Sequence, residues 1–211
     1  QGYPGNIDVE AEFTLQDSTL VLRHRAVSDA DTLYCLTSHG YFNLAGHNSG
    51  NAMDQHILLF AHEYTPSNAE GIPLGITQSV ERTPMDLREL LPIQTHIEDS
   101  FPQLVQAKGY DHNYVINGNI GELRPAAIAM SDLTGISMRV DSTMPGIHFY
   151  TANYVSVDHP GKGGCTYGPR HGFCLETQFY PDAIHHESFP SPILEAGKVY
   201  THSTVFAFNN I

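Results

Sequence analysis

The chain has few positive charges and no long apolar run. Lysine and arginine total 10 residues against 23 aspartates and glutamates, which gives a formal net charge of −13 over 211 residues. A chain this acidic repels phosphate backbones, so nucleic acid is not expected as a partner. The longest apolar stretches, such as residues 57–61, are far shorter than the roughly 20 residues that cross a bilayer. We therefore expect a soluble protein without a membrane partner.

Cysteine is also scarce. The three cysteines are Cys35, Cys165 and Cys174, an odd number with no CxxC pair. This usage favours reduced thiols over a disulfide framework, because disulfide-stabilised domains carry cysteines in pairs. It predicts a cytoplasmic location.

Common catalytic motifs are missing. There is no GxSxG, no HExxH, no P-loop and no dinucleotide fingerprint. The nearest approach to a metal cluster is His185-His186-Glu187. If this segment is a strand, its two histidines point to opposite faces and do not bind one ion. We expect no metal and no cofactor.

Alternation of apolar and polar residues dominates what is present. Ile7, Val9 and Phe13 alternate with acidic residues, which predicts a half-buried strand. A polar turn at residues 16–18 precedes a second apolar stretch at 20–22, so the two predict a hairpin. Further strands are predicted at 32–37, 55–61, 114–116, 127–130, 136–141, 148–153 and 200–208.

These strands predict an all-β fold. The 18 glycines and 13 prolines separate them into short segments, and only residues 85–91 suggest a short helix. The absence of a βαβ rhythm favours a large antiparallel β-sandwich, formed by one domain over residues 1–211. The glycine-rich stretch 158–172 is predicted to be a mobile loop over a site.

Four segments place ionisable or amide groups beside aromatic residues: 36–44, 109–113, 145–153 and 172–178. Aromatic faces with converging polar groups suit a sugar. Glu176 follows three apolar residues, so it is either a desolvated general base or an exposed strand carboxylate. His39, Asp111 and His148 are each either site residues or structural ones, Asp111 as a turn cap.

The same segments resemble motifs of the aldose 1-epimerase family. LTSHGYFNLAG (36–46), GYDHN (109–113), PGIHFYTAN (145–153) and GFCLETQFYPDA (172–183) follow in the family's order. The intervening HEYTPSNAEGIPLGI (62–76) and RTPMDLR (82–88) are similar to family segments as well. The resemblance implies a galactose mutarotase-like supersandwich and interconversion of the anomers of hexoses such as galactose or glucose, without a cofactor.

The resemblance also implies roles for individual residues. Glu176 corresponds to the family's general base and His39 to its general acid. Asp111 corresponds to a residue that binds sugar hydroxyls. Asn43 and His148 lie in matching motifs and are predicted to contact the monosaccharide as well, although the family often has glutamine where this chain has His148.

The chain departs from the family pattern in two places. Ser38 and Gly40 replace the usual neighbours of the acid histidine. The family's upstream sheet region, with an arginine and a second histidine in the substrate site, has no counterpart here. We expect the chain to be the C-terminal part of an epimerase that a missing N-terminal segment or chain completes.

Two alternatives remain open. A truncated, catalytically weak module of the same fold would bind the sugar without efficient turnover. A glycoside hydrolase would instead use Asp111 and Glu176 as a pair of carboxylates, about 5–10 Å apart across a glycosidic bond.

Overall fold

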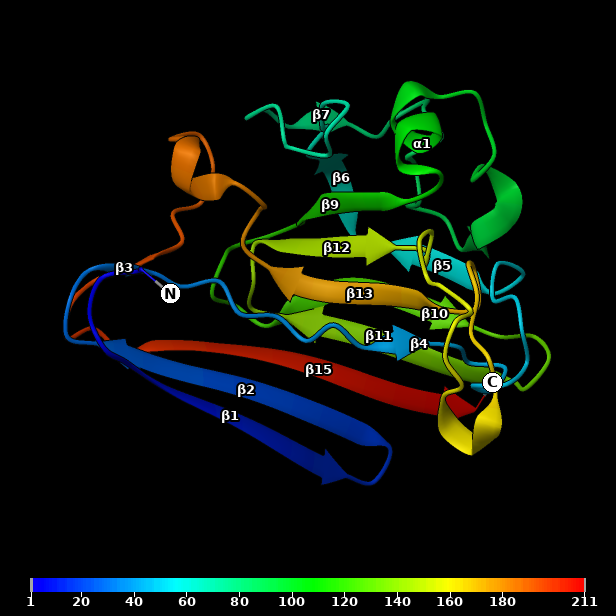
Figure 1. Cartoon of the computed structure of the whole chain (residues 1–211), viewed down its shortest axis with the longest axis horizontal. Helices are drawn as coiled ribbons and strands as arrows, with labels where there is room; N and C mark the ends of the chain where they lie inside the picture. Colours follow the sequence, from blue (N-terminus) through cyan, green and yellow to red (C-terminus); the bar gives the residue numbers. More distant parts are fainter. Residues whose placement is uncertain (1, 211) are drawn as a thin grey trace.

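The computed structural model describes residues 2–210 and contains two large antiparallel sheets (Figure 1). The seven-stranded sheet has the order β1 (Ile7–Gln16), β2 (Thr19–Ser28), β15 (Tyr200–Asn210), β11 (Ile136–Ser142), β10 (Arg124–Met130), β5 (His56–Leu59) and β8 (Leu91–Pro92). The six-stranded sheet has the order β4 (Tyr41–Phe42), β13 (Phe173–Gln178), β12 (Gly146–Tyr150), β9 (Asp111–Ile116), β6 (Ala61–Tyr64) and β7 (Gln78–Ser79).

The remaining elements are short. β3 (Thr32–Leu33) and β14 (Ile193–Leu194) form a separate two-stranded sheet. One α-helix, α1 (Pro102–Ala107), and three 3-10 turns, Ile93–Thr95, Lys162–Gly164 and Ala183–His185, complete the part of the chain that the structure describes. This confirms the predicted all-β sandwich. Within residues 2–210, no helix is long and apolar enough to cross a membrane.

The core lies between the two large sheets, because alternate residues of each strand point inward. Phe149 of β12 and Phe173 of β13 are fully buried, with ring centroids 6.4 Å apart. Met138 and Val140 of β11 belong to the same buried cluster from the opposite sheet. Each such side chain contributes about 2 kcal/mol by leaving water. The intervening residues of β12 and β13 therefore point to the outer face of the six-stranded sheet.

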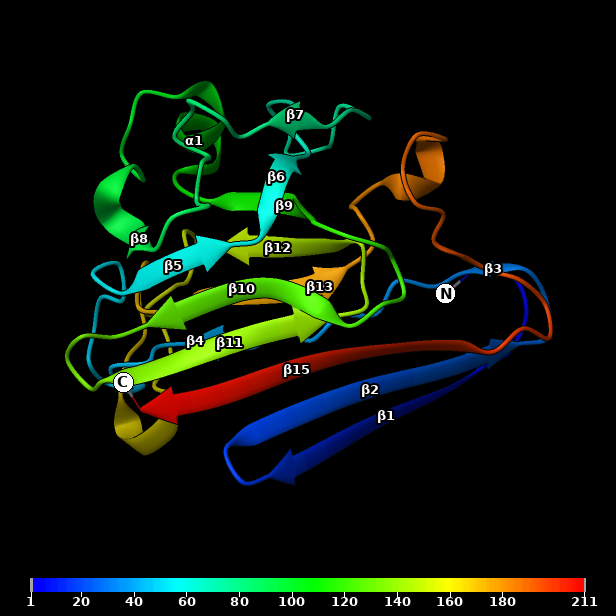
Figure 2. The ribbon, with the colours of Figure 1, turned by 180° about the vertical axis from the view of Figure 1, so that it is seen from behind.

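Most predicted strands exist with shifted ends. β9, β10, β11 and β15 each include the predicted stretch and extend beyond it. Predicted strand 55–61 is divided between β5 and β6, because the chain leaves the seven-stranded sheet and enters the six-stranded one there (Figure 2). Predicted strand 32–37 is limited to β3, and the rest of it has no regular structure.

The β1–β2 hairpin is confirmed, with Ile7 opposite Ser28 and Gln16 opposite Thr19. The prediction that β1 is half-buried is wrong, since all ten residues of the strand are exposed. β1 is the outermost strand of its sheet, and no other described segment packs on either of its faces (Figure 1). The alternating pattern correctly predicted a strand at this position, but it did not predict that both faces of the strand are exposed.

The helix predicted at residues 85–91 is also wrong. A turn closed by the hydrogen bond from Asp86 N to Thr83 O reaches only the start of this stretch, and residues 86–90 are in neither a helix nor a strand. Met85 and Leu87 are buried as single anchors. Such a short segment cannot sustain an isolated helix without tertiary support. Helix α1 forms elsewhere: Pro102 stands at its start, and Lys108 ends it in the left-handed conformation (φ 56°).

Candidate active site

The outer face of the six-stranded sheet carries a group of ionisable side chains. In β12 and β13, His148 lies opposite Glu176. Tyr150 lies opposite Cys174 on one side and opposite Asp111 of β9 on the other. Because residues two apart on a strand share a face, all five side chains gather on the side away from the core.

His39 reaches this face from outside the sheet. It lies between β3 and β4 in residues 34–40, which have no regular secondary structure. Its Nε2 is 3.6 Å from Oε1 of Glu176, and its ring stacks on Tyr41 with centroids 5.1 Å apart. The His39 side chain is 52% exposed, whereas that of Glu176 is 9% exposed. The pair joins a solvent-accessible imidazole to a sheltered carboxylate.

A second histidine–carboxylate pair lies beside the first. His148 Nε2 is 2.8 Å from Oδ1 of Asp111. The other ring nitrogen of His148 is buried without a hydrogen-bond partner among the described residues. The 2.8 Å contact with His148 fixes the orientation of the Asp111 carboxylate, which is otherwise partly exposed to water.

These groups surround a cavity of about 360 Å³, a size within the range of about 300–1,000 Å³ that is usual for small-molecule sites. Three tyrosines add aromatic surface to its polar walls. The cavity is lined by His39, Tyr41, Asp111, His148, Tyr150, Tyr154, Glu176, Gln178 and Pro181. Four of the five predicted site residues are thus brought together.

Burial raises the pKa of Glu176 above its ordinary value of 4.5. The positive charges of His148 and His39 act in the opposite direction, and the neighbouring Asp111 carboxylate raises the pKa further. The alternative of an exposed strand carboxylate is wrong, because the residue is only 7% exposed. A desolvated carboxylate with a raised pKa is an effective proton acceptor near neutral pH.

Sequence reasoning did not assign Tyr41, Tyr150, Tyr154, Gln178 or Pro181 to the cavity. Gln178 was within reach of the alternation rule, since it lies two residues after Glu176 on β13. Desolvation, followed by several neighbouring acidic groups, raises the pKa of Tyr41 to about 12. Its phenol therefore stays protonated and can donate a hydrogen bond.

Asn43 requires a correction, because it does not line this cavity. Its Nδ2 donates to the backbone oxygens of Gly50 and His171, and its Oδ1 accepts hydrogen bonds from Ala45 N and Gln55 Nε2. With both ends of the amide already bonded to the protein, Asn43 fastens loops together. Its predicted contact with a ligand of the acid–base group is not supported.

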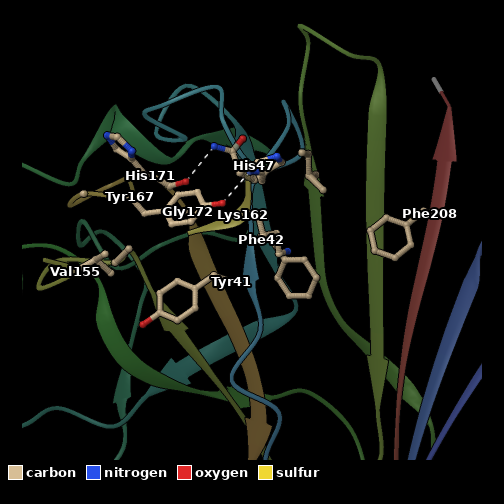
Figure 3. Close-up of a pocket in the computed structure, with 13 residues that line it drawn as sticks. Tyr41, Phe42, His47, Val155, Lys162, Tyr167, His171, Gly172 and Phe208 are labelled. Carbon is tan, nitrogen blue, oxygen red and sulfur yellow. Dashed lines mark hydrogen bonds between the residues drawn. The ribbon is translucent and has the colours of Figure 1, made fainter. Parts of the chain in front are cut away.

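Asn43 instead lines a larger and more apolar pocket of about 590 Å³ (Figure 3). Phe42, Val155 and Phe208 contribute to its walls. Part of the predicted loop 158–172 also lines this pocket, through Lys162, Tyr167, Gly168, His171 and Gly172. None of these loop residues lines the acid–base cavity.

His185 and His186 do not lie on a strand, so the prediction that their side chains point to opposite faces of one is wrong. His185 ends a 3-10 turn, and both histidines turn toward Asp182. His186 Nε2 lies 3.2 Å from Oδ2 of that carboxylate. The two imidazoles thus share one anionic partner.

Comparison with known proteins gives the same assignment as the motifs. The family model described as aldose 1-epimerase matches residues 1–207. The chain belongs to the aldose 1-epimerase family. A member of the family from Mus musculus, galactose mutarotase, is 36% identical over 209 residues, which are 99% of this chain and 59% of the relative. The aldose 1-epimerase of Escherichia coli is 30% identical over 211 residues, 99% of this chain and 60% of that protein. The chain thus spans about three fifths of these relatives.

Solved family structures share the fold. An aldose epimerase homologue from C. elegans has a TM-score of 0.88 and 26% identity, over all of this chain and 62% of the other. Galactose 1-epimerase from Lactobacillus acidophilus has a TM-score of 0.82 and 25% identity, over 99% of this chain and 58% of the other. The sandwich described above is therefore the fold of the family.

Proposed function

We propose that the chain interconverts the α and β anomers of a hexose, with Glu176 as proton acceptor and His39 as proton donor. The observation that carries this proposal is the 3.6 Å approach of His39 Nε2 to Glu176 Oε1 at the edge of a polar cavity. The anomeric hydroxyl and the ring oxygen of a sugar are bonded to the same carbon. Their proton acceptor and proton donor must therefore lie close together, as these two groups do.

The proposed reaction is a pair of proton transfers that opens the ring. Glu176 takes the proton of the anomeric hydroxyl while protonated His39 gives a proton to the ring oxygen. The bond between C1 and the ring oxygen breaks and leaves an open-chain aldehyde. Rotation about the C1–C2 bond and the reverse transfers close the ring as either anomer. Atoms and charges balance without an oxidant or a metal.

Asp111 and His148 are proposed to bind hydroxyl groups of the sugar. They lie in the same cavity as the acid and base, and their mutual contact of 2.8 Å gives the carboxylate a fixed direction. Held in this way, a substrate is positioned before the reaction, which is a large part of catalysis in such sites.

A neutral hexose such as galactose or glucose fits the site better than a sugar phosphate. Asp111 and Glu176 place two carboxylates in the cavity wall, and the whole chain carries a net charge of −13. Both features disfavour an anionic ligand. The relative from Mus musculus bears the name galactose mutarotase, which supports the same class of substrate.

A cytoplasmic location is part of the proposal. Cys35, Cys165 and Cys174 are all free thiols in the structure. Free thiols are kept reduced in that compartment.

Polarimetry of freshly dissolved α-D-galactose and α-D-glucose tests the proposal. The 211-residue chain is expected to accelerate the approach to equilibrium rotation over buffer. Glu176→Gln should abolish the acceleration, whereas Glu187→Gln, at an exposed carboxylate outside the cavity, should not. Sugar binding without acceleration would overturn the enzymatic proposal in favour of a sugar-binding module. Release of reducing ends from a glycoside would overturn it in favour of a hydrolase.

A further inference from the structure

Cys174 adds a third potential ligand to the acid–base pair. It precedes Glu176 by two residues on β13, so its side chain points to the same outer face. One ligand atom from each of Cys174, Glu176 and His39 can be chosen so that all three lie within 4.8 Å of one another. Among residues 2–210, it is the single group of three His, Cys, Asp or Glu side chains that lie close enough together to hold a metal ion.

We propose that His39, Cys174 and Glu176 bind a thiophilic divalent metal ion such as Zn²⁺, Co²⁺ or Cd²⁺, and that this ion inhibits the chain. An imidazole, a thiolate and a carboxylate form a ligand set that suits Zn²⁺. Three protein ligands leave a fourth tetrahedral position open to water or to a sugar hydroxyl.

The distances require only a small movement. With metal–ligand bonds of about 2.0–2.3 Å, the ligands of a tetrahedral ion lie roughly 3.5 Å apart. His39 Nε2 and Glu176 Oε1 are already 3.6 Å apart. His39 lies on a segment outside helices and strands, and its side chain is half-exposed, so it is the member of the group that can adjust to the sulfur.

Inhibition follows from the identity of the ligands. A bound ion occupies the lone pairs that Glu176 uses to accept a proton and His39 uses to carry one. The sulfur selects against hard cations, because Mg²⁺ and Ca²⁺ prefer oxygen ligands. Zinc-type ions should therefore inhibit at concentrations where magnesium and calcium do not.

The sequence contains no closely spaced metal-binding motif, which is why no metal was predicted from it. The present group joins a Cys-x-Glu pair to a histidine that is remote in sequence, and tertiary folding brings them together.

Cobalt absorption tests the metal site without any reference to sugar chemistry. In a Cys35→Ser/Cys165→Ser background, Cys174 is the single thiol, so a thiolate-to-cobalt charge-transfer band in the near ultraviolet reports on it alone. The band should appear with Co²⁺, disappear when Zn²⁺ displaces Co²⁺, and be absent in Cys174→Ala. A Co²⁺ spectrum without a thiolate band would overturn the proposal.

Inhibition gives a second readout. Each variant is compared with its own rate in the absence of metal. The Zn²⁺ concentration for half-inhibition should rise at least about tenfold in Cys174→Ala, while the Cys35→Ser/Cys165→Ser background should keep the original value. An unchanged value in Cys174→Ala would contradict the proposal. If Cys174→Ala does not fold, as judged by thermal unfolding, Cys174→Ser takes its place in both experiments. His39→Gln should then also lose the cobalt band.

If the chain lacks epimerase activity, the cobalt band still decides whether the site exists.

Discussion

Two pockets share Tyr41 of β4, at the edge of the six-stranded sheet, yet they differ in chemistry. The larger one, of about 590 Å³, has Phe42, Val155 and Phe208 in its walls and no carboxylate. The smaller one, of about 360 Å³, contains two carboxylates and two histidines. The larger pocket is therefore not the one to which we assign the proposed proton transfers. The smaller pocket differs in that two carboxylates lie beside two histidines there, in partial shelter from water.

The sharpest test of this comparison replaces one histidine in each pocket with glutamine. His39 lies 3.6 Å from Glu176, whereas His47 lies in the apolar pocket with its Nδ1 2.8 Å from the hydroxyl of Tyr167. Loss of a general acid should lower the mutarotation rate in His39→Gln roughly 10²–10⁴-fold. His47→Gln should change it less than about twofold, because that ring is not within reach of the proposed reacting atoms. Polarimetry measures both, and equal losses would remove the distinction between the pockets.

The core beneath the polar pocket should be sensitive to acid. Burial, with a further contribution from His148, lowers the pKa of His112 to about 4. Because the unfolded chain takes up this proton near pH 6.5, stability is full above that pH and falls as the pH drops toward 4. We expect this histidine alone to account for a loss of roughly 2 kcal/mol between about pH 7.5 and pH 5.

Urea unfolding at the two pH values measures this loss. His112→Phe should reduce the pH dependence, since phenylalanine keeps an aromatic ring beside Tyr64 without a titrating group. His202, whose pKa burial also lowers to about 4, should retain its own share. An unchanged pH dependence in His112→Phe would show that this histidine does not titrate as its burial implies.

A smaller effect should separate the two pockets through the pH dependence of the rate. The acid limb of the mutarotation profile should lie above pH 4.5, because burial raises the pKa of Glu176. His148, when protonated, opposes this rise. His148→Gln should therefore shift the limb to higher pH by up to about one unit. His47→Gln serves as the control and should leave the limb in place, and a shift to lower pH in His148→Gln would contradict the assignment.

The smallest catalytic effect is expected in the apolar pocket. Phe208 is only partly buried, so Phe208→Ala should lower the free energy of unfolding by about 1–2 kcal/mol. The mutarotation rate should stay within about twofold of the original, since no proton-transfer group is touched. Urea unfolding and polarimetry give the two values. A large loss of rate in a folded variant would show that the apolar pocket takes part in the reaction.

Several features of the fold and site were readable in the sequence for clear physical reasons. Strand positions followed from period-two alternation, and the motifs around His39, Asp111, His148 and Glu176 led to four residues that share one cavity. Alternation alone did not show whether both faces of a strand are covered, so β1 was expected to be half-buried and is exposed throughout. Asn43 was assigned from its motif, but the bonding of its amide depends on Gly50 and His171, which only the folded chain brings near.

The sequence by itself determined the all-β class and the family, because these depend on local pattern and on residue type, and its motifs singled out His39 and Glu176 as the pair that we propose to transfer protons. Tertiary structure alone decided that Cys174 lies within ligand distance of that pair and that Asp111 is held by His148. It also decided that Asn43 faces a different pocket. These relations arise from strand register and from the path of the chain between sheets, which set distances between residues remote in sequence.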